Sequence, residues 1–210
     1  MSLRKKAAER CSHCLMRLEL CLCPSLPKLE LATRLIVVMS KRELITPTNT
    51  GRLASQALPN SVVLACGDQN RPFDLLEHLM PECPSIVLYP SEEAVILTDE
   101  WLKPFERPLN LIVPDGNWRQ TSKMVRRVPH MVDYPVVKVP QGIGSLYKVR
   151  KETKAEGLAT IEAIARALGI IEGPQVQVEL EKLLDLMVSR TMASRGLASQ
   201  LDNRRQVPQG

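Results

Sequence analysis

Four of the six cysteines in this 210-residue chain lie within thirteen residues, at Cys11, Cys14, Cys21 and Cys23. The spacing is C-x2-C-x6-C-x-C, and two close pairs of thiolates at such spacing can hold one zinc ion in a tetrahedral site. Disulfides would need an oxidising compartment, and a redox-active C-x-x-C pair normally follows a strand, which is missing here. We therefore predict a structural zinc knuckle whose folding depends on metal, with His13 as a bystander.

A second group of residues that could take part in catalysis or binding follows an apolar stretch: Asp115, Gly116, Asn117 and Trp118. An aspartate between a strand and a helix is commonly a turn or capping residue, but it can also be a general base or hydrogen-bond acceptor facing a ligand. Trp118 is one of two tryptophans and can belong to the core or flank a ligand. The local pattern leaves both interpretations open.

The segment 40–51, SKRELITPTNTG, is rich in hydroxyl and amide groups and ends where we expect a helix. The free N–H groups of a helix N-terminus can bind an anion or a polar ligand, although an ordinary capped loop has the same composition. The segment carries neither a GxGxxG nor a P-loop pattern, so it predicts no dinucleotide or nucleoside-triphosphate site of those kinds. Residues 90–93, PSEE, can start a helix with an acidic first turn.

Positive charge is concentrated in one stretch. The net charge is +5, but residues 115–154 carry nine Lys and Arg against three acidic residues. This stretch is either a solvated helix face or a surface that contacts phosphates. Aromatic residues make up only 3% of the chain, which argues against a base-stacking platform of the single-strand-binding kind.

Short apolar runs between these segments predict a parallel sheet. They are near-continuously apolar and bounded by Pro, Gly or Asp, as expected of strands covered on both faces. The strands are expected at 34–39, 61–65, 85–89, 109–113 and 136–139, with a weaker candidate at 94–98. Helical patterns occupy 51–58, 118–127, 160–168 and 175–192, the third with Thr160 at its cap and Gly169 just past its end. Strands that alternate with helices indicate an α/β fold with helices on both faces, in which ligands bind beyond the carboxyl ends of the strands.

The composition is that of a globular protein, with 44% hydrophobic and 24% charged residues. The first ten residues are polar and no apolar run approaches a membrane span, so we expect a cytoplasmic protein with no membrane partner.

Five motifs follow one another along the chain in a specific order: the four cysteines, TPTNTGRLA at 46–54, LYPSEEA at 88–94, PDGNWRQTSKM at 114–124 and EGLATIEAIA at 156–165. Together they resemble the DTW-domain family, which is similar to the knotted SPOUT-type RNA-modifying proteins. The family is named for an Asp-x-Thr-Trp motif, to which Asp115 and Trp118 correspond, while Asn117 replaces the Thr. Asn can cap the following helix as Thr does. Ala159 stands where the family commonly has Ser.

The resemblance implies a zinc-binding segment at 1–28, a SPOUT-like domain at 29–195 with a C-terminal trefoil knot, and a flexible tail at 196–210. It implies transfer of the 3-amino-3-carboxypropyl group from S-adenosylmethionine to N3 of a tRNA uridine, with tRNA as partner and no obligate protein partner. Asp115 is the implied base, and Trp118 shapes the pocket or the surface that binds the base. The alternatives are a SPOUT-type RNA methyltransferase and a non-catalytic zinc-containing protein for RNA binding or ribosome assembly.

Two residue sets follow from the resemblance. The implied cofactor-binding residues are Thr48, Asn49, Thr50, Gly51, Leu88, Pro90, Pro114, Leu146 and Thr160. The implied RNA-binding residues are Arg52, Arg119, Lys123, Arg126, Arg127, Lys148, Arg150 and Lys151.

Overall fold

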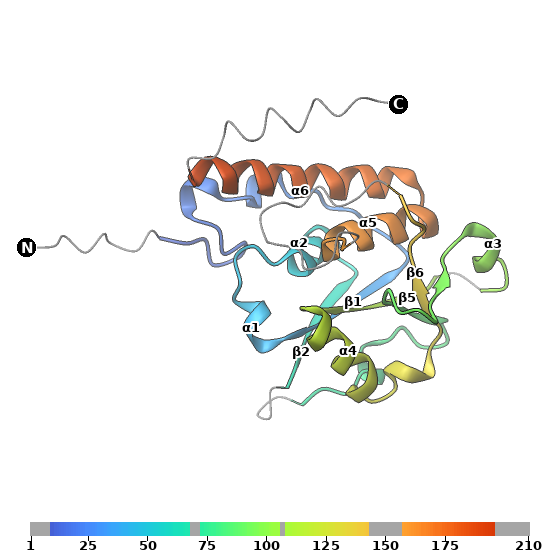
Figure 1. The fold of residues 1–210 in the computed structure, drawn as a ribbon. Helices are drawn as coiled ribbons and strands as arrows, with labels where there is room; N and C mark the ends of the chain where they lie inside the picture. The colour runs from blue at the N-terminus through green and yellow to red at the C-terminus, as the bar shows by residue number, and fades with distance from the viewer. Residues whose placement is uncertain (1–8, 68–71, 106–107, 143–156, 196–210) are drawn as a thin grey trace, which may run out of the picture.

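The fold was taken from a computed structural model, which describes residues 9–67, 72–105, 108–142 and 157–195 (Figure 1). Six strands form one sheet in the order β2-β1-β5-β3-β6-β4, and every neighbouring pair is parallel. The strands are β1 (Arg34–Ser40), β2 (Ser61–Cys66), β3 (Ser85–Leu88), β4 (Val95–Ile96), β5 (Asn110–Asp115) and β6 (Val136–Lys138). The prediction of an α/β fold with a parallel sheet is confirmed.

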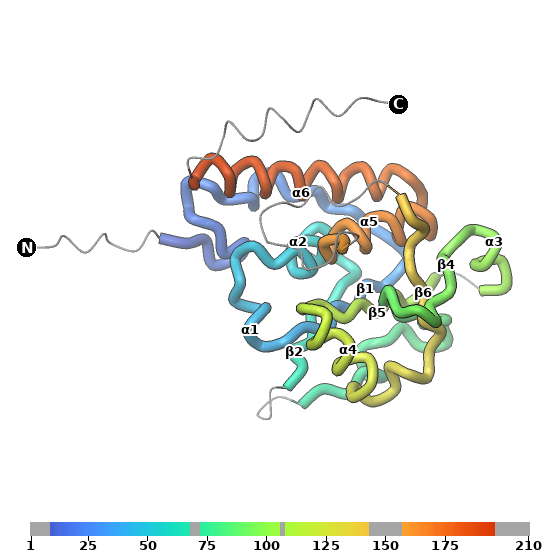
Figure 2. The backbone as a smooth tube through the Cα atoms, in the orientation of Figure 1, coloured from blue at the N-terminus to red at the C-terminus, as the bar shows by residue number. Residues whose placement is uncertain are grey.

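Two hydrophobic cores cover the two faces of the sheet, because successive side chains of each strand point to opposite sides. Val37 and Val113 belong to the core under α2 (Thr50–Ala57), α5 (Thr160–Ile171) and α6 (Pro174–Ser194). Ile36 and Ile112 belong to the core under α4 (Trp118–Arg127). Figure 2 shows α2, α5 and α6 on one side of the strands and α4 on the other. Near-continuous apolar strands were therefore the right signal for a sheet buried on both faces.

Short elements complete the described chain. Two of them are single-turn helices, α1 (Lys41–Leu44) after β1 and α3 (Asp99–Leu102) after β4. Four are 3-10 turns: η1 (Leu18–Leu20), η2 (Cys23–Ser25), η3 (Leu76–His78) and η4 (Met131–Asp133). None of the helices in the described ranges is long and apolar enough to cross a membrane.

The N-terminal segment packs into the main core and does not stand apart. Cys14, Met16 and Leu22 are buried in the same cluster as the apolar face of α6. The guanidinium of Arg190, on α6, donates to the carbonyl of Cys21 and to the hydroxyl of Ser25, 3.4 Å away. The small unit around the cysteines is thus tied to the domain by apolar packing and by side-chain hydrogen bonds.

The boundaries of α5 differ from the expectation. Its N-cap is Ala159 and Thr160 is its first helical residue, so the Thr160 hydroxyl is not used as a cap. The helix runs on through Gly169 because Ile171 is buried against the core, and it ends before Gly173, whose φ of +119° suits glycine alone.

Residues 90–93 do not start a helix but form a turn that leads directly into β4. The expected trefoil knot depends on the segment 143–156, which lies outside the described residues.

Candidate functional site

Asp115 is the last residue of β5, two positions beyond the expected end of this strand, because β1 continues to pair with it through Met39. Its side chain is buried, with 5% of its surface exposed. Oδ2 accepts a hydrogen bond of 2.6 Å from Asn49 Nδ2, and Oδ1 accepts one from the hydroxyl of Thr160. Three separate motifs of the sequence therefore meet at one carboxylate, at the carboxyl edge of the sheet.

Gly51 allows α2 to approach this carboxylate. A Cβ atom at this position would lie 2.8 Å from Asp115 Oδ2, 3.0 Å from its Cγ and 3.2 Å from Val37 Cγ1. Because two of these distances are at or below the closest that real Cβ atoms show, any larger residue here would push α2 away from Asp115. The glycine is thus required by close packing of a helix against the site.

Asn49 connects the loop after β1 to Asp115. Its Oδ1 caps α2 by accepting from Arg52 N at 2.7 Å. Its Nδ2 donates both to Asp115 and to Glu43 Oε2, at 3.0 Å. The amide is 2% exposed and uses both its oxygen and its nitrogen, so its orientation is strongly determined. Glu43 was missed by the sequence reasoning, although it lies in the polar segment already singled out.

Trp118 opens α4, three residues after the end of β5. The helix begins with a capping box, because Asn117 Oδ1 accepts from Gln120 N at 3.0 Å and Gln120 Oε1 accepts from Asn117 N at 2.9 Å. Asn117 therefore caps α4 with its own side chain, as expected of an Asn at this position. The Trp118 ring is half-buried and belongs to neither of the two hydrophobic cores, so packing of the core does not account for it.

A row of cations extends along α4 from this point. Arg119, Lys123, Arg126 and Arg127 are exposed and recur at helical spacing of about one turn. Within the described part of the chain none of them forms a salt bridge. The helix is about 15 Å long at 1.5 Å per residue, and the row from Arg119 to Arg127 covers about 12 Å of it.

The other implied residues lie around the same edge or outside the described ranges. Leu88 ends β3, the strand next to β5, and Pro114 is buried beside Asp115, whereas Pro90 is exposed in the turn after β3. Thr48 is half-buried in the loop before α2, and Thr50 is buried at its first turn. Leu146, Lys148, Arg150 and Lys151 lie outside the described residues. The roles given to all these residues stay predictions.

Arg52 does not present its charge to solvent. Its guanidinium donates to the carbonyls of His13, Cys14, Thr46 and Pro47 at 3.1 to 3.5 Å. Burial lowers the pKa of this guanidinium. The RNA contact expected for Arg52 stays a prediction, and nothing in the sequence indicated these carbonyl partners.

A cavity of about 340 Å³ lies between α5, α6 and the segment after β6. Its polar lining includes Glu162, Arg166, Glu181 and Asp185, and it includes neither Asp115, Asn49 nor Thr160. This cavity is therefore separate from the carboxylate cluster at the sheet edge.

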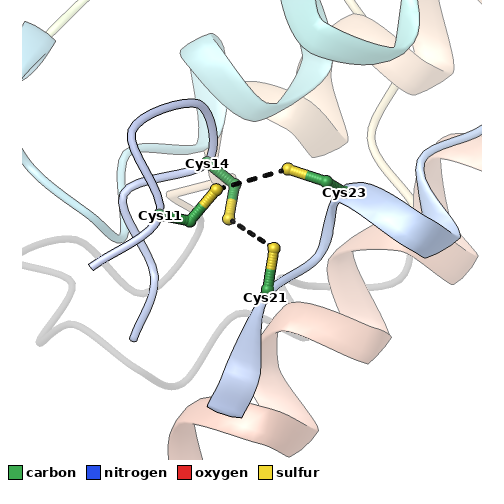
Figure 3. Close-up of side chains that lie close together, drawn as sticks. All are labelled: Cys11, Cys14, Cys21 and Cys23. Carbon is green, nitrogen blue, oxygen red and sulfur yellow. Dashed lines mark hydrogen bonds between the residues drawn. The ribbon is translucent and has the colours of Figure 1, made fainter. Parts of the chain in front are cut away.

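The four cysteines of the N-terminal segment converge as the spacing predicted (Figure 3). Their sulfur atoms all lie within 4.8 Å of one another, with Cys11 Sγ 3.6 Å from Cys23 Sγ and Cys14 Sγ 3.7 Å from Cys21 Sγ. Four thiolates about 2.3 Å from a tetrahedral zinc ion lie about 3.8 Å from one another, so the donor set and its spacing fit zinc.

The thiols of this cluster differ in acidity. Hydrogen bonds from the backbone of Cys14 and His13 lower the pKa of Cys11 to about 6. Burial, followed by the bond with Cys11, raises the pKa of Cys23 to about 12. Thiols this close together ionise together only when a cation neutralises them, which is the behaviour of a metal site.

Comparison with known proteins places this arrangement in a family. The model of the DTW domain matches residues 8–192. The chain is similar to tRNA-uridine aminocarboxypropyltransferase 2 of Macaca fascicularis, with 27% identity over 172 residues, covering 80% of this chain and 58% of the relative. It is also similar to the protein of the same name from Mus musculus, with 26% identity over 168 residues, covering 77% of this chain and 56% of the relative.

The chain thus spans somewhat more than half the length of these curated relatives. No solved structure matches it. Because the family match covers the knuckle, the sheet and all three motifs that meet at Asp115, the chain belongs to the DTW-domain family.

Proposed function

We propose that this chain transfers the 3-amino-3-carboxypropyl group of S-adenosylmethionine to N3 of a uridine in tRNA and releases 5′-methylthioadenosine. The observation that carries the proposal is the buried Asp115 carboxylate, on which the loop after β1 and the N-terminus of α5 converge. The names of the two relatives support the reaction class.

The sheet edge fits a polar donor molecule. The hydroxyl of Ser40, at the carboxyl end of β1, is buried without a hydrogen-bond partner in the described part of the chain. An unsatisfied buried hydroxyl costs free energy that a polar ligand group can recover. We place the donor against the loop 46–51 and Thr160, where α2 comes within contact distance of Asp115. When bound, S-adenosylmethionine supplies a sulfonium that activates the carbon to be transferred.

Asp115 acts on the acceptor in this proposal. In the transfer a bond forms between uridine N3 and the γ-carbon of the side chain, the bond from that carbon to sulfur breaks, and its electron pair stays on sulfur. The proton of N3–H goes to the Asp115 carboxylate, which Asn49 and Thr160 hold in one orientation. Correct placement of donor and acceptor around a fixed base provides much of such a rate enhancement.

The α4 cations give the acceptor its path to the site. Phosphate contacts supply a large share of nucleic-acid affinity, and structured RNA is recognised mainly by shape and backbone, with single bases turned out. Arg119, Lys123, Arg126 and Arg127 lead away from Trp118 along the helix, so tRNA phosphates bound there would bring a nucleotide to Asp115. Trp118 then flanks the reacting base.

Nucleoside analysis tests the proposal. The chain is incubated with tRNA and S-adenosylmethionine labelled in the aminocarboxypropyl carbons, and the digested nucleosides are measured by mass spectrometry. We expect the label in a modified uridine together with methylthioadenosine. A methylated nucleoside with S-adenosylhomocysteine would instead make the chain a methyltransferase. RNA binding without consumption of the donor would make it a non-catalytic binding protein.

A further inference from the structure

We propose that Arg52 is a positioning residue that couples metal binding in the four-cysteine knuckle to the geometry of the Asp115 site. The inference takes the role of that site from the proposed function. Arg52 stands in the first turn of α2, and its guanidinium reaches both the knuckle and the loop before the helix.

The contact with the knuckle involves main-chain carbonyls of the metal-binding turn itself. Arg52 Nη1 donates to His13 O at 3.1 Å, and Nη2 donates to Cys14 O at 3.2 Å. Cys14 is one of the four clustered cysteines, and its Sγ is paired with that of Cys21. These carbonyls point at Arg52 only while the turn between the first two cysteines keeps its shape, and a turn of this size folds around its metal.

The same guanidinium holds the loop that carries Asn49. Nη2 also lies 3.4 Å from Thr46 O and 3.5 Å from Pro47 O. Thr46 O in turn accepts from Asn49 N at 3.0 Å, and Arg52 N donates to Asn49 Oδ1. Arg52 therefore touches Asn49 through its own backbone and also through the carbonyl of Thr46, and Asn49 donates to Asp115.

The half-buried guanidinium of Arg52 depends on acceptors from both the knuckle and the loop before α2. With the knuckle folded, its donors are matched by carbonyls, and Nε alone stays buried without a partner in the described part of the chain. Without the knuckle it loses the two carbonyls of residues 13 and 14, and a buried guanidinium that lacks acceptors is costly. We expect the Arg52 guanidinium then to turn toward solvent. This movement would release the loop 46–49 and loosen the N-terminal turn of α2.

The chain offers matched controls. Arg190 also ties the knuckle to a helix, through Cys21 O, but it lies on α6, and among the described residues its guanidinium forms hydrogen bonds with the N-terminal segment and none with the loop before α2. Gln56 Nε2 donates to His13 O at 2.6 Å, from the same helix but one turn further from Asn49. If docking of the knuckle in general mattered, all three residues would behave alike.

The test is hydrogen exchange of the full chain with zinc bound and after removal of zinc by a chelator, read in peptides covering residues 46–58. For the wild type we expect zinc removal to speed exchange of these amides about ten- to hundredfold, the loss of one or two hydrogen bonds to a charged group. In Arg52→Gln the ratio of the exchange rate without zinc to the rate with zinc should fall close to one. Arg190→Gln and Gln56→Ala should keep most of the wild-type ratio. Arg52→Lys, which keeps the positive charge but not the planar guanidinium with its several N–H donors, should give an intermediate ratio.

Three results would overturn the inference: an unchanged exchange rate in zinc-free wild type, an unchanged ratio in Arg52→Gln, or an equal loss in Arg190→Gln. If a variant does not fold, the exchange rates of the wild type with and without zinc still test whether the knuckle is coupled to residues 46–58. Turnover adds a second readout, in which Arg52→Lys should lower kcat while its zinc affinity stays within about threefold of the wild type. If no tRNA product forms with any variant, the proposed function fails, and the exchange ratios still decide the coupling.

Discussion

Gly51→Ala tests whether the approach of α2 to Asp115 is as tight as the structure requires. The added Cβ would lie 2.8 Å from Asp115 Oδ2 and 3.2 Å from Val37 Cγ1, so helix and carboxylate must separate by several tenths of an ångström. Overpacking of this kind costs about 1–3 kcal/mol. Replacing a helical glycine by alanine returns at most about 1 kcal/mol. We therefore expect a net loss of about 0–2 kcal/mol in the free energy of unfolding, the difference between these two terms.

The substitution should lower activity as well as stability. A shift of Asp115 relative to bound reactants costs up to about a hundredfold in rate per ångström, so a shift of a few tenths of an ångström should lower turnover by up to roughly tenfold. Urea denaturation gives the first quantity, and formation of the modified uridine gives the second.

Gly169→Ala is the matched control for this experiment. Its added Cβ would lie 2.7 Å from Gln177 Oε1, which is equally close, but it lies between α5 and α6 and away from Asp115. We expect Gly169→Ala to change stability alone. If Gly51→Ala raised stability by about 1 kcal/mol and kept wild-type turnover, the close contact with Asp115 would have no functional meaning.

Three further changes probe the remaining parts of the molecule. Asp115→Asn keeps the shape of the side chain but loses the acceptor for the proton, so turnover should fall about 10²–10⁴-fold while circular dichroism stays native; normal turnover would refute the assignment of the base. Cys14→Ser should lose bound zinc and stability, measured by metal analysis and thermal melting, and wild-type protein purified without any metal would contradict the zinc assignment. Lys123→Gln, at an exposed position on α4, should weaken tRNA binding and reduce the slope of log K against log salt by about one, and an unchanged slope would place the tRNA elsewhere.

Local sequence patterns were sufficient to predict most of the strands and helices and the cluster of four cysteines. The apolar runs that became β1 and β5 are long enough and rich enough in Val and Ile to define buried strands without any tertiary information. The cysteine cluster was equally accessible, because close spacing in sequence forces closeness in space. Asn49 and Asn117 cap α2 and α4 with their own side chains, as short polar residues before helical patterns commonly do, and Asn117 also has Gln120 three positions later.

Contacts between the motifs could not be predicted from local sequence patterns, and Thr160 shows why. A Thr before an apolar helical pattern is expected to cap its own helix, and the sequence offers no reason to choose otherwise. In the structure Ala159 takes the cap position, its N–H donates to Glu162 Oε2 at 2.7 Å, and the Thr160 hydroxyl donates to Asp115. The shift by one residue depends on the distance between α5 and β5, which the sheet order determines and no local pattern encodes. Asp115 itself was recognised from its position at a strand end. Its partners became definite only once β1, β5 and α5 were placed side by side, and for that reason the site depends on the correct docking of α2 and α5 as much as on its own residues.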